Sequence, residues 1–244
     1  MKIKLWHIAV FVLALIVFAV ARAPASLVAQ QRPGELTYAR AEGTIWNGQL
    51  HDVLVGGYRA ERASWRLALL DVVQGRAIVP IDFENGDIEG RVVLLGNIGG
   101  DRRIAMPSLQ LRGLRLSDGL ALPGETTFYN VDVLFEDRRC VRAQGRIVSD
   151  AFVQGGQALG WNGPNIEGRP RCEGDLAEIL LTGANEAGER VNVRVLLEGD
   201  GAASWRVSVL SDRRETNAAL AAAGFSPGVA DPVLGYGGDT RWLP

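Results

Sequence analysis

Tyr129-Asn130-Val131-Asp132-Val133-Leu134-Phe135-Glu136 alternates apolar and polar side chains over most of its length. Side chains two residues apart lie on the same face of a β-strand, so the alternation predicts a strand with one packed and one solvated face. The packed face would carry Tyr129, Val131, Val133 and Phe135.

The same two-residue period recurs along the chain. Its apolar rows comprise Val191, Val193, Val195 and Leu197; Trp205, Val207 and Val209; and Leu109 and Leu111. The last row slips phase at Gly113 and resumes at Leu114 and Leu116, and a glycine at a phase slip is typical of a β-bulge. With 30 glycines at short intervals, these rows predict an all-β meander with helical insertions rather than alternating strands and helices.

Short helices are expected at residues 67–74, 150–159 and 211–223. In the third, Ser211 or Asp212 can cap the N-terminus and Gly224 can end the helix. The tail, residues 225–244, is rich in Gly and Pro and is expected to form a loop.

One short sequence occurs twice. Ala63-Ser64-Trp65-Arg66 returns as Ala203-Ser204-Trp205-Arg206, which suggests that each copy places a Trp on the packed face of an antiparallel strand. The repetition raises the hypothesis of two similar halves, about 35–122 and 123–211, followed by the tail. Because the identity covers four residues, one undivided domain stays an open alternative.

The N-terminus carries a long apolar segment. The 17 residues from Leu5 to Ala21 contain no charged side chain, with Lys2 and Lys4 before them and Arg22 after them. Seventeen residues reach the lower limit for a helix that crosses a hydrocarbon core of about 30 Å. The segment also exceeds the apolar core of a usual signal peptide, about 7–15 residues.

The basic N-terminal flank predicts an orientation. Residues 1–4 would be cytoplasmic, 5–22 a transmembrane anchor, and 23–244 periplasmic. The alternative is a signal peptide cleaved after Ala25, and we expect the anchor to be retained. The expected fold class is mainly β: a single N-terminal transmembrane helix, followed by an antiparallel β-rich periplasmic domain, a curved sheet or sandwich, with a few short helices.

Charge narrows the range of partners. Without Lys2, Lys4 and Arg22, the remaining chain has 23 basic and 28 acidic residues, a net charge of −5. A mildly acidic body without a basic stripe argues against nucleic acid as a partner.

The chain has two cysteines, Cys140 and Cys172. In an oxidising compartment, two cysteines can form one disulfide without a leftover thiol, and we expect this bridge. Two free buried thiols are the alternative. A metal site is less favoured, because the only histidines are His7, inside the apolar segment, and His51.

Catalytic patterns are weak. His51 is the only histidine after the apolar segment, and its neighbour Asp52 would point to the opposite face of a strand. No glycine-rich element has the strand–loop–helix context that binds phosphate. We therefore expect no catalytic residues, cofactor or metal, and interpret the tryptophans chiefly as core anchors.

Gly43-Thr44-Ile45-Trp46-Asn47-Gly48 carries a resemblance to a known family. The chain resembles protein N of the type II secretion system, whose members have a G-T-hydrophobic-W-x-G motif after one inner-membrane anchor. The supporting similarities, in chain order, are Pro24-Ala25-Ser26, Trp65-Arg66-Leu67, Leu70 to Gly75, Cys140 with Cys172, and the glycine-rich end at Gly235–Gly238.

The resemblance implies a non-catalytic accessory subunit of the secretion system, held in the inner membrane by residues 5–22. Its partners would be other secretion subunits, reached through edge-strand pairing or the membrane helix. The rival function is a periplasmic carrier of lipid or another apolar molecule.

The apolar rows separate these two functions. A subunit that binds proteins should gather the rows into one largely closed core and leave an edge strand exposed. We expect this arrangement, with a single core containing Trp65, Tyr129, Val131, Val133, Val193 and Trp205. An open apolar trough would instead favour the carrier, because a large exposed apolar area usually has a ligand or partner.

Overall fold

The computed structural model describes residue 15 and residues 18–29, 36–97, 100–117, 120–158, 160–227 and 233–241. The strands are β1 (Leu36–Thr37), β2 (Arg40–Gly43), β3 (Asn47–Val55), β4 (Tyr58–Arg66), β5 (Arg76–Gly86), β6 (Ile88–Asn97), β7 (Arg102–Ser117), β8 (Leu120–Glu136), β9 (Arg139–Ser149), β10 (Ile166–Glu173), β11 (Leu176–Ala184), β12 (Arg190–Leu197), β13 (Ala202–Leu210), β14 (Ser226–Pro227) and β15 (Val233–Arg241). The helices are α2 (Ser26–Ala29), α3 (Leu69–Val73), α4 (Ala151–Ala158) and α5 (Arg214–Ala222).

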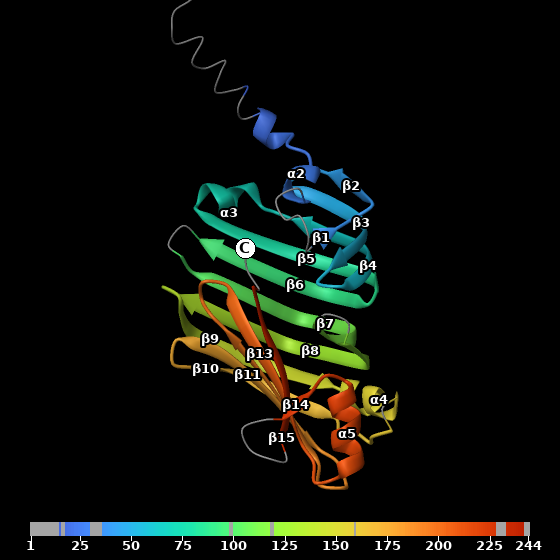
Figure 1. The fold of residues 1–244 in the computed structure, drawn as a ribbon. Helices are drawn as coiled ribbons and strands as arrows, with labels where there is room; N and C mark the ends of the chain where they lie inside the picture. Colours follow the sequence, from blue (N-terminus) through green and yellow to red (C-terminus); the bar gives the residue numbers. More distant parts are fainter. Residues whose placement is uncertain are drawn as a thin grey trace, which may run out of the picture.

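All of these strands belong to one antiparallel sheet, which confirms the mainly β prediction. From β3 to β13 each strand pairs with the next in sequence, and β15 then joins β13. Figure 1 shows the strands from β3 to β8 stacked in a ladder that leads away from α2, while the last strands turn back in front of the middle of the sheet. The expected curved sheet is thus a single sheet that folds over itself at its C-terminal end.

The predicted helices are present, with shorter bounds than expected, as α3, α4 and α5. The predicted membrane segment, residues 5–22, lies mostly outside the described residues. Among the residues that the structure describes, none of the helices has both the length and the apolar character needed to cross a bilayer. The position 122/123, considered above as a boundary between halves, lies inside β8.

The prediction that the tail is a loop is wrong. Residues 233–241 form β15, which pairs along its whole length with β13. Its glycines fit this strand because they lie close to β13: a Cβ atom on Gly237 would lie 2.8 Å from the backbone oxygen of Trp205. Close packing against a neighbouring strand, rather than a turn, explains this glycine content.

A bulge in β8 corrects one prediction about the packed face. The register between β8 and β9 shifts between Tyr129 and Asp132, where Asn130 has a φ of 48°. The extra residue reverses the alternation, so Phe128 packs toward the apolar side while Tyr129 is 50% exposed. Tyr129 therefore does not share a face with Val131. The bulge predicted at Gly113 is confirmed by a register shift there.

The core is divided into three clusters along one face of the sheet. The N-terminal cluster contains Ala25, Leu50, Val53, Ala63 and Trp65, and the middle cluster contains Ala60, Ile88 and Leu109. The larger C-terminal cluster joins β8 to β15 with α4 and α5, and includes Val131, Val133, Val193 and, partly buried, Trp205. The expected single core is therefore wrong: Trp65 belongs to a different cluster, and Tyr129 is exposed.

The predicted disulfide is confirmed. Cys140 at the start of β9 and Cys172 near the end of β10 are bonded, with their Cα atoms 5.5 Å apart. Residues 147–149 of β9 pair with residues 166–168 of β10, so the bridge ties the two strands together at the opposite end from their ladder. In the chain-entropy model, closure of a loop of this length stabilises the fold by about 3–4 kcal/mol.

A buried carboxylate, Glu189, lies beside the C-terminal cluster and accepts several hydrogen bonds from buried or partly buried side chains. It is 2% exposed and accepts hydrogen bonds from Trp161 Nε1 at 2.6 Å, Ser211 Oγ at 2.6 Å and Asn185 Nδ2 at 2.7 Å. Burial raises the pKa of this carboxyl, but hydrogen bonds, including one from Thr216, outweigh burial and hold the pKa below its ordinary value. The carboxylate thus links the turn before β12 to the segments that precede α5 and follow α4.

We predict that Glu189→Ala lowers the free energy of unfolding by about 3 kcal/mol at neutral pH, because buried donors lose their acceptor. The control is Glu186→Ala in the same turn, which is exposed and should change stability by less than about 0.5 kcal/mol. Denaturant unfolding of the full chain in detergent measures both.

The same experiment has a pH signature. Since the folded-state pKa of Glu189 is lowered, its contribution is present above the ordinary glutamate pKa and is lost as the pH falls through the folded-state value. The difference between wild type and Glu189→Ala should therefore narrow on acidification. A difference that stays constant down to strongly acidic pH would contradict this assignment.

Candidate functional site

The residues of the family-like motif form the tight connection between β2 and β3. Thr44 N donates to the carbonyl of Asn47 at 2.9 Å, and Asn47 N donates to Thr44 Oγ1 at 3.3 Å. Gly43 has a φ of 86°, and a Cβ atom there would lie 2.4 Å from the Asn47 oxygen. The turn therefore requires glycine at its first position.

Gly48 is required for a different reason. It lies opposite Trp65 of β4, and the indole ring covers it so closely that a Cβ atom would lie 2.3 Å from the ring. Trp65 Nε1 donates to the carbonyl of Ile45 at 2.9 Å. The ring thus packs on one motif residue and hydrogen-bonds to another, which fixes the turn on the sheet.

The turn also holds the end of the N-terminal segment. Trp46 Nε1 donates to the carbonyl of Val20 at 2.9 Å, and Ile45 N donates to the carbonyl of Ala23 at 3.0 Å. Ala25 N donates to the carbonyl of Gly43 at 3.2 Å, and the Ala25 residue is 1% exposed within the N-terminal cluster. We call this set of contacts the junction. Its effect is to attach residues 20–25 rigidly to the first strands of the sheet.

The repeated Ala-Ser-Trp-Arg sequence has a structural counterpart at the other end of the sheet. Trp205 of β13 lies opposite Gly238 of β15, and a Cβ atom on Gly238 would lie 3.2 Å from the indole ring. Trp65 and Gly48 have the same cross-strand relation. In both places a Trp covers a glycine on the neighbouring strand, with one such pair near each end of the strand order.

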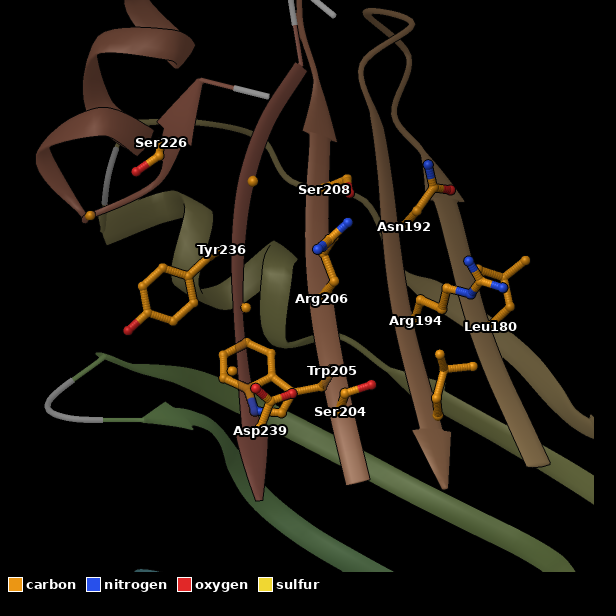
Figure 2. Close-up of a pocket in the computed structure, with 15 residues that line it drawn as sticks. Leu180, Asn192, Arg194, Ser204, Trp205, Arg206, Ser208, Ser226, Tyr236 and Asp239 are labelled. Atoms are coloured by element: carbon orange, nitrogen blue, oxygen red, sulfur yellow. The ribbon is translucent and has the colours of Figure 1, made fainter. Parts of the chain in front are cut away.

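A groove of about 1100 Å³ lies along β12, β13 and β15. Figure 2 shows Ser204, Arg206 and Ser208 in a row along β13, with Arg194 on the next strand. We call it the β15 groove. The polar residues that alternate with Trp205, Val207 and Val209 indicate a solvated face of β13. The other wall of the groove is β15, which lies in the tail that the sequence predicts to be a loop, so the groove could not be predicted.

The charges in the β15 groove are unequally partnered. Arg194 and Arg171 both bind Glu178, which is 2% exposed, with Nε–Oε distances of 2.5 and 2.7 Å. Burial raises the pKa of Glu178, but these hydrogen bonds outweigh burial and lower it overall. Arg206 lies opposite Arg194 and is exposed, and its guanidinium makes no ion pair or hydrogen bond to another described residue.

The groove borders an open sheet edge. β14 pairs only Ser226 and Pro227 with Gly235 and Leu234 of β15. Over residues 237–241, β13 is the strand that pairs with β15 among the described strands, and the outer side of β15 has no strand partner there. Unpaired N–H and C=O groups along such an edge can bind an additional strand.

The region around His51 offers little chemistry. His51 and Asp52 line a small depression of about 270 Å³ together with Arg59, Glu61, Arg62 and Asn85. Asp52 is paired with Arg59 at 2.8 Å, and the nearest carboxylate to His51 belongs to Glu42, at 3.7 Å. No Ser, Thr or Cys nucleophile lines the depression. Across the described ranges, no group of three or more potential metal ligands is present.

Comparison with known families gives one match. A family model described as type II secretion system (T2SS), protein N, matches residues 34–232, which is most of the chain and includes the 43–48 motif and both cysteines. No curated protein and no solved structure matches the chain significantly.

We predict that Gly48→Ala destabilises the chain by about 1–3 kcal/mol, because the added methyl group overlaps the Trp65 ring and the ring must move. Gly96→Ala on β6 is the matched control, since a Cβ atom there meets no other atom within 4 Å. Thermal unfolding of the full chain in detergent should show a lower Tm for the first variant and an unchanged or slightly higher Tm for the second. Equal shifts would contradict the packing argument.

Proposed function

This chain belongs to the protein N family of the type II secretion system, and we propose that it is a non-catalytic accessory subunit that acts through protein contacts in the periplasm. The family match is the observation that carries the proposal.

The proposal includes an inner-membrane location with the sheet in the periplasm. The support is the uncharged segment Leu5 to Ala21 with Lys2 and Lys4 on one side. The Cys140–Cys172 disulfide is in keeping with an oxidising compartment.

The junction supports retention of the anchor. Ala25, at the alternative cleavage site, is buried in the N-terminal cluster of the folded chain and hydrogen-bonded to Gly43, so the fold uses contacts from this segment. Release of the segment would also remove the partners of Trp46 Nε1 and Ile45 N. Residues 20–25, at the end of the proposed anchor, therefore form part of the folded domain.

The open edge of β15 is the proposed contact point for a partner. An extended segment could add to this edge by main-chain hydrogen bonds, while the β15 groove receives its side chains. The exposed Arg206 favours a partner segment with an acidic side chain at that position. This surface lies at the end of the strand order farthest from the junction.

Site-specific photo-crosslinking in native membranes tests this proposal. A photoreactive amino acid in place of Asp239, which is exposed on β15, should crosslink to another secretion subunit identified by mass spectrometry. The control position is Glu89, exposed on β6, where we expect no such product. Products at neither position, or equally at both, would contradict the β15 contact. Failure of the full chain to co-purify with any secretion subunit would contradict the subunit role itself.

A second function, carriage of an apolar ligand, is favoured by one observation. Apolar side chains of β5 and β6, such as Val79, Ile81, Phe83 and Val92, continue the apolar face but are only partly buried. The helices α4 and α5 contribute core residues to the C-terminal cluster alone. Among the described residues, no helix contributes a buried side chain to the sheet between the junction and the C-terminal cluster, so apolar surface is partly exposed there.

Native mass spectrometry of the full chain distinguishes the two functions. If the chain is a subunit, lipid should dissociate as the detergent is exchanged, and the spectrum should show the mass of the protein without lipid. Secretion subunits should stay bound. Stoichiometric lipid that survives this exchange, and that is lost in a Val92→Asp variant but kept in a Val141→Asp variant on exposed β9 surface, would instead establish the carrier function.

A further inference from the structure

Helix α3 exposes its apolar side chains to an unusual degree. Leu69, Leu70, Val72 and Val73 are 56%, 69%, 37% and 76% exposed, and the helix has no buried residue. A short helix normally forms in a protein because it buries one apolar face. Because no residue of α3 is buried in the described part of the chain, its apolar surface is available for contact with a membrane or a partner.

The exposed apolar residues are concentrated at one end of the molecule. Of the eleven large apolar side chains that are exposed in the described residues, eight lie within 15–27 or 69–73. Figure 1 shows α3 at the same end of the sheet as α2 and the residues that precede it. Leu67 N donates to the carbonyl of Trp46 at 2.6 Å. Trp46 is a residue of the junction, so α3 begins two residues after a direct contact with it.

The charges around α3 suit the surface of a bilayer. Its only acidic residue, Asp71, is paired with Arg76 at 3.6 Å. Arg66 precedes the helix and Arg22 ends the apolar segment, and both are exposed. Basic residues beside an apolar patch are attracted to anionic lipid headgroups, and apolar side chains on a short helix can enter the interface between headgroups and acyl chains.

We propose that α3 is a second membrane contact, which inserts Leu69, Leu70 and Val73 into the periplasmic face of the bilayer that holds the N-terminal segment. This inference rests on the membrane anchorage proposed above. A lipid surface fits better than a protein partner, because a five-residue helix is too small to supply the roughly 800 Å² per partner of a stable protein interface. The junction already holds α3 beside the place where the apolar segment ends.

The contact would set the orientation of the sheet. With the junction in place, one transmembrane helix alone lets the helix and the attached domain tilt together in the bilayer. A second point of attachment, offset from the first, restricts this motion and directs the ladder of strands away from the membrane. The long apolar face and the β15 groove would then stand at defined heights above the bilayer.

Depth measurement by electron paramagnetic resonance tests the proposal. The full chain is reconstituted in nanodiscs of mixed zwitterionic and anionic phospholipids, with a nitroxide attached to a cysteine introduced as Leu70→Cys, Leu15→Cys or Tyr129→Cys. Tyr129 is the control, because it is 50% exposed on β8 away from the junction. Accessibility to oxygen, which concentrates in the bilayer, is compared with accessibility to a water-soluble nickel chelate.

The expected result is an oxygen-to-nickel accessibility ratio at least about threefold higher for the label at 70 than for the label at 129, with the label at 15 highest. A label at 70 that matches the label at 129 would overturn the proposal while the label at 15 still reports the anchor. A label at 70 shielded from both reagents would also overturn it, since that result indicates protein cover. A water-exposed label at 15 would show that the anchorage has failed.

Discussion

Hydrogen bonding between consecutive strands is the interaction on which the rest of this structure depends. From β3 to β13, each strand finds its backbone partners in the strands next to it in sequence, so the sheet extends for the length of the chain. One face of this ladder is apolar and needs cover. The C-terminal strands supply it by turning back over β8, where α4 and α5 add to the C-terminal cluster. The strands nearer the junction have no such return, and their apolar face stays partly exposed.

The two ends of the ladder are finished differently. At the first end, the motif turn, Trp65 and the buried Ala25 combine the sheet edge with the N-terminal segment, so β3 is protected by β1, β2 and the junction. At the last end, β14 pairs with two residues of β15, and over residues 237–241 no described strand pairs with the outer side of β15. An end joined to the N-terminal segment and an end with a partly open edge give the strand order a direction. This polarity follows from strand order and from which edge carries the covering residues, without any catalytic group.

Much of the architecture could be predicted because period-two alternation depends only on local sequence. The strands around Val193 and Val207 follow from this alternation. The clearest helix follows from its capping residues, and the disulfide follows from the presence of two cysteines. The exposure of Tyr129 could not be predicted, because the bulge depends on the positive φ of Asn130. Most Asn residues have a negative φ, so the residue type alone does not indicate a bulge. The strand at 233–241 was missed because its glycines are selected by Trp205 on a neighbouring strand, a contact that no local pattern contains. The β15 groove was missed for the same reason, and the division into three clusters depends on how far the sheet turns back.

The neighbour-to-neighbour order of the strands has a consequence for biogenesis. In the proposed topology residues 1–4 stay in the cytoplasm and the residues next to the anchor emerge first. Each new strand would then find its partner already outside. Strand addition of this kind closes only short loops, so it costs little entropy at each step. The exceptions come late: the Cys140–Cys172 bond and the return of β13 and β15 over β8 require residues far into the sequence. Until they arrive, the growing edge of the sheet would be a bare strand beside an apolar face, a state in which a partly folded chain is prone to aggregate.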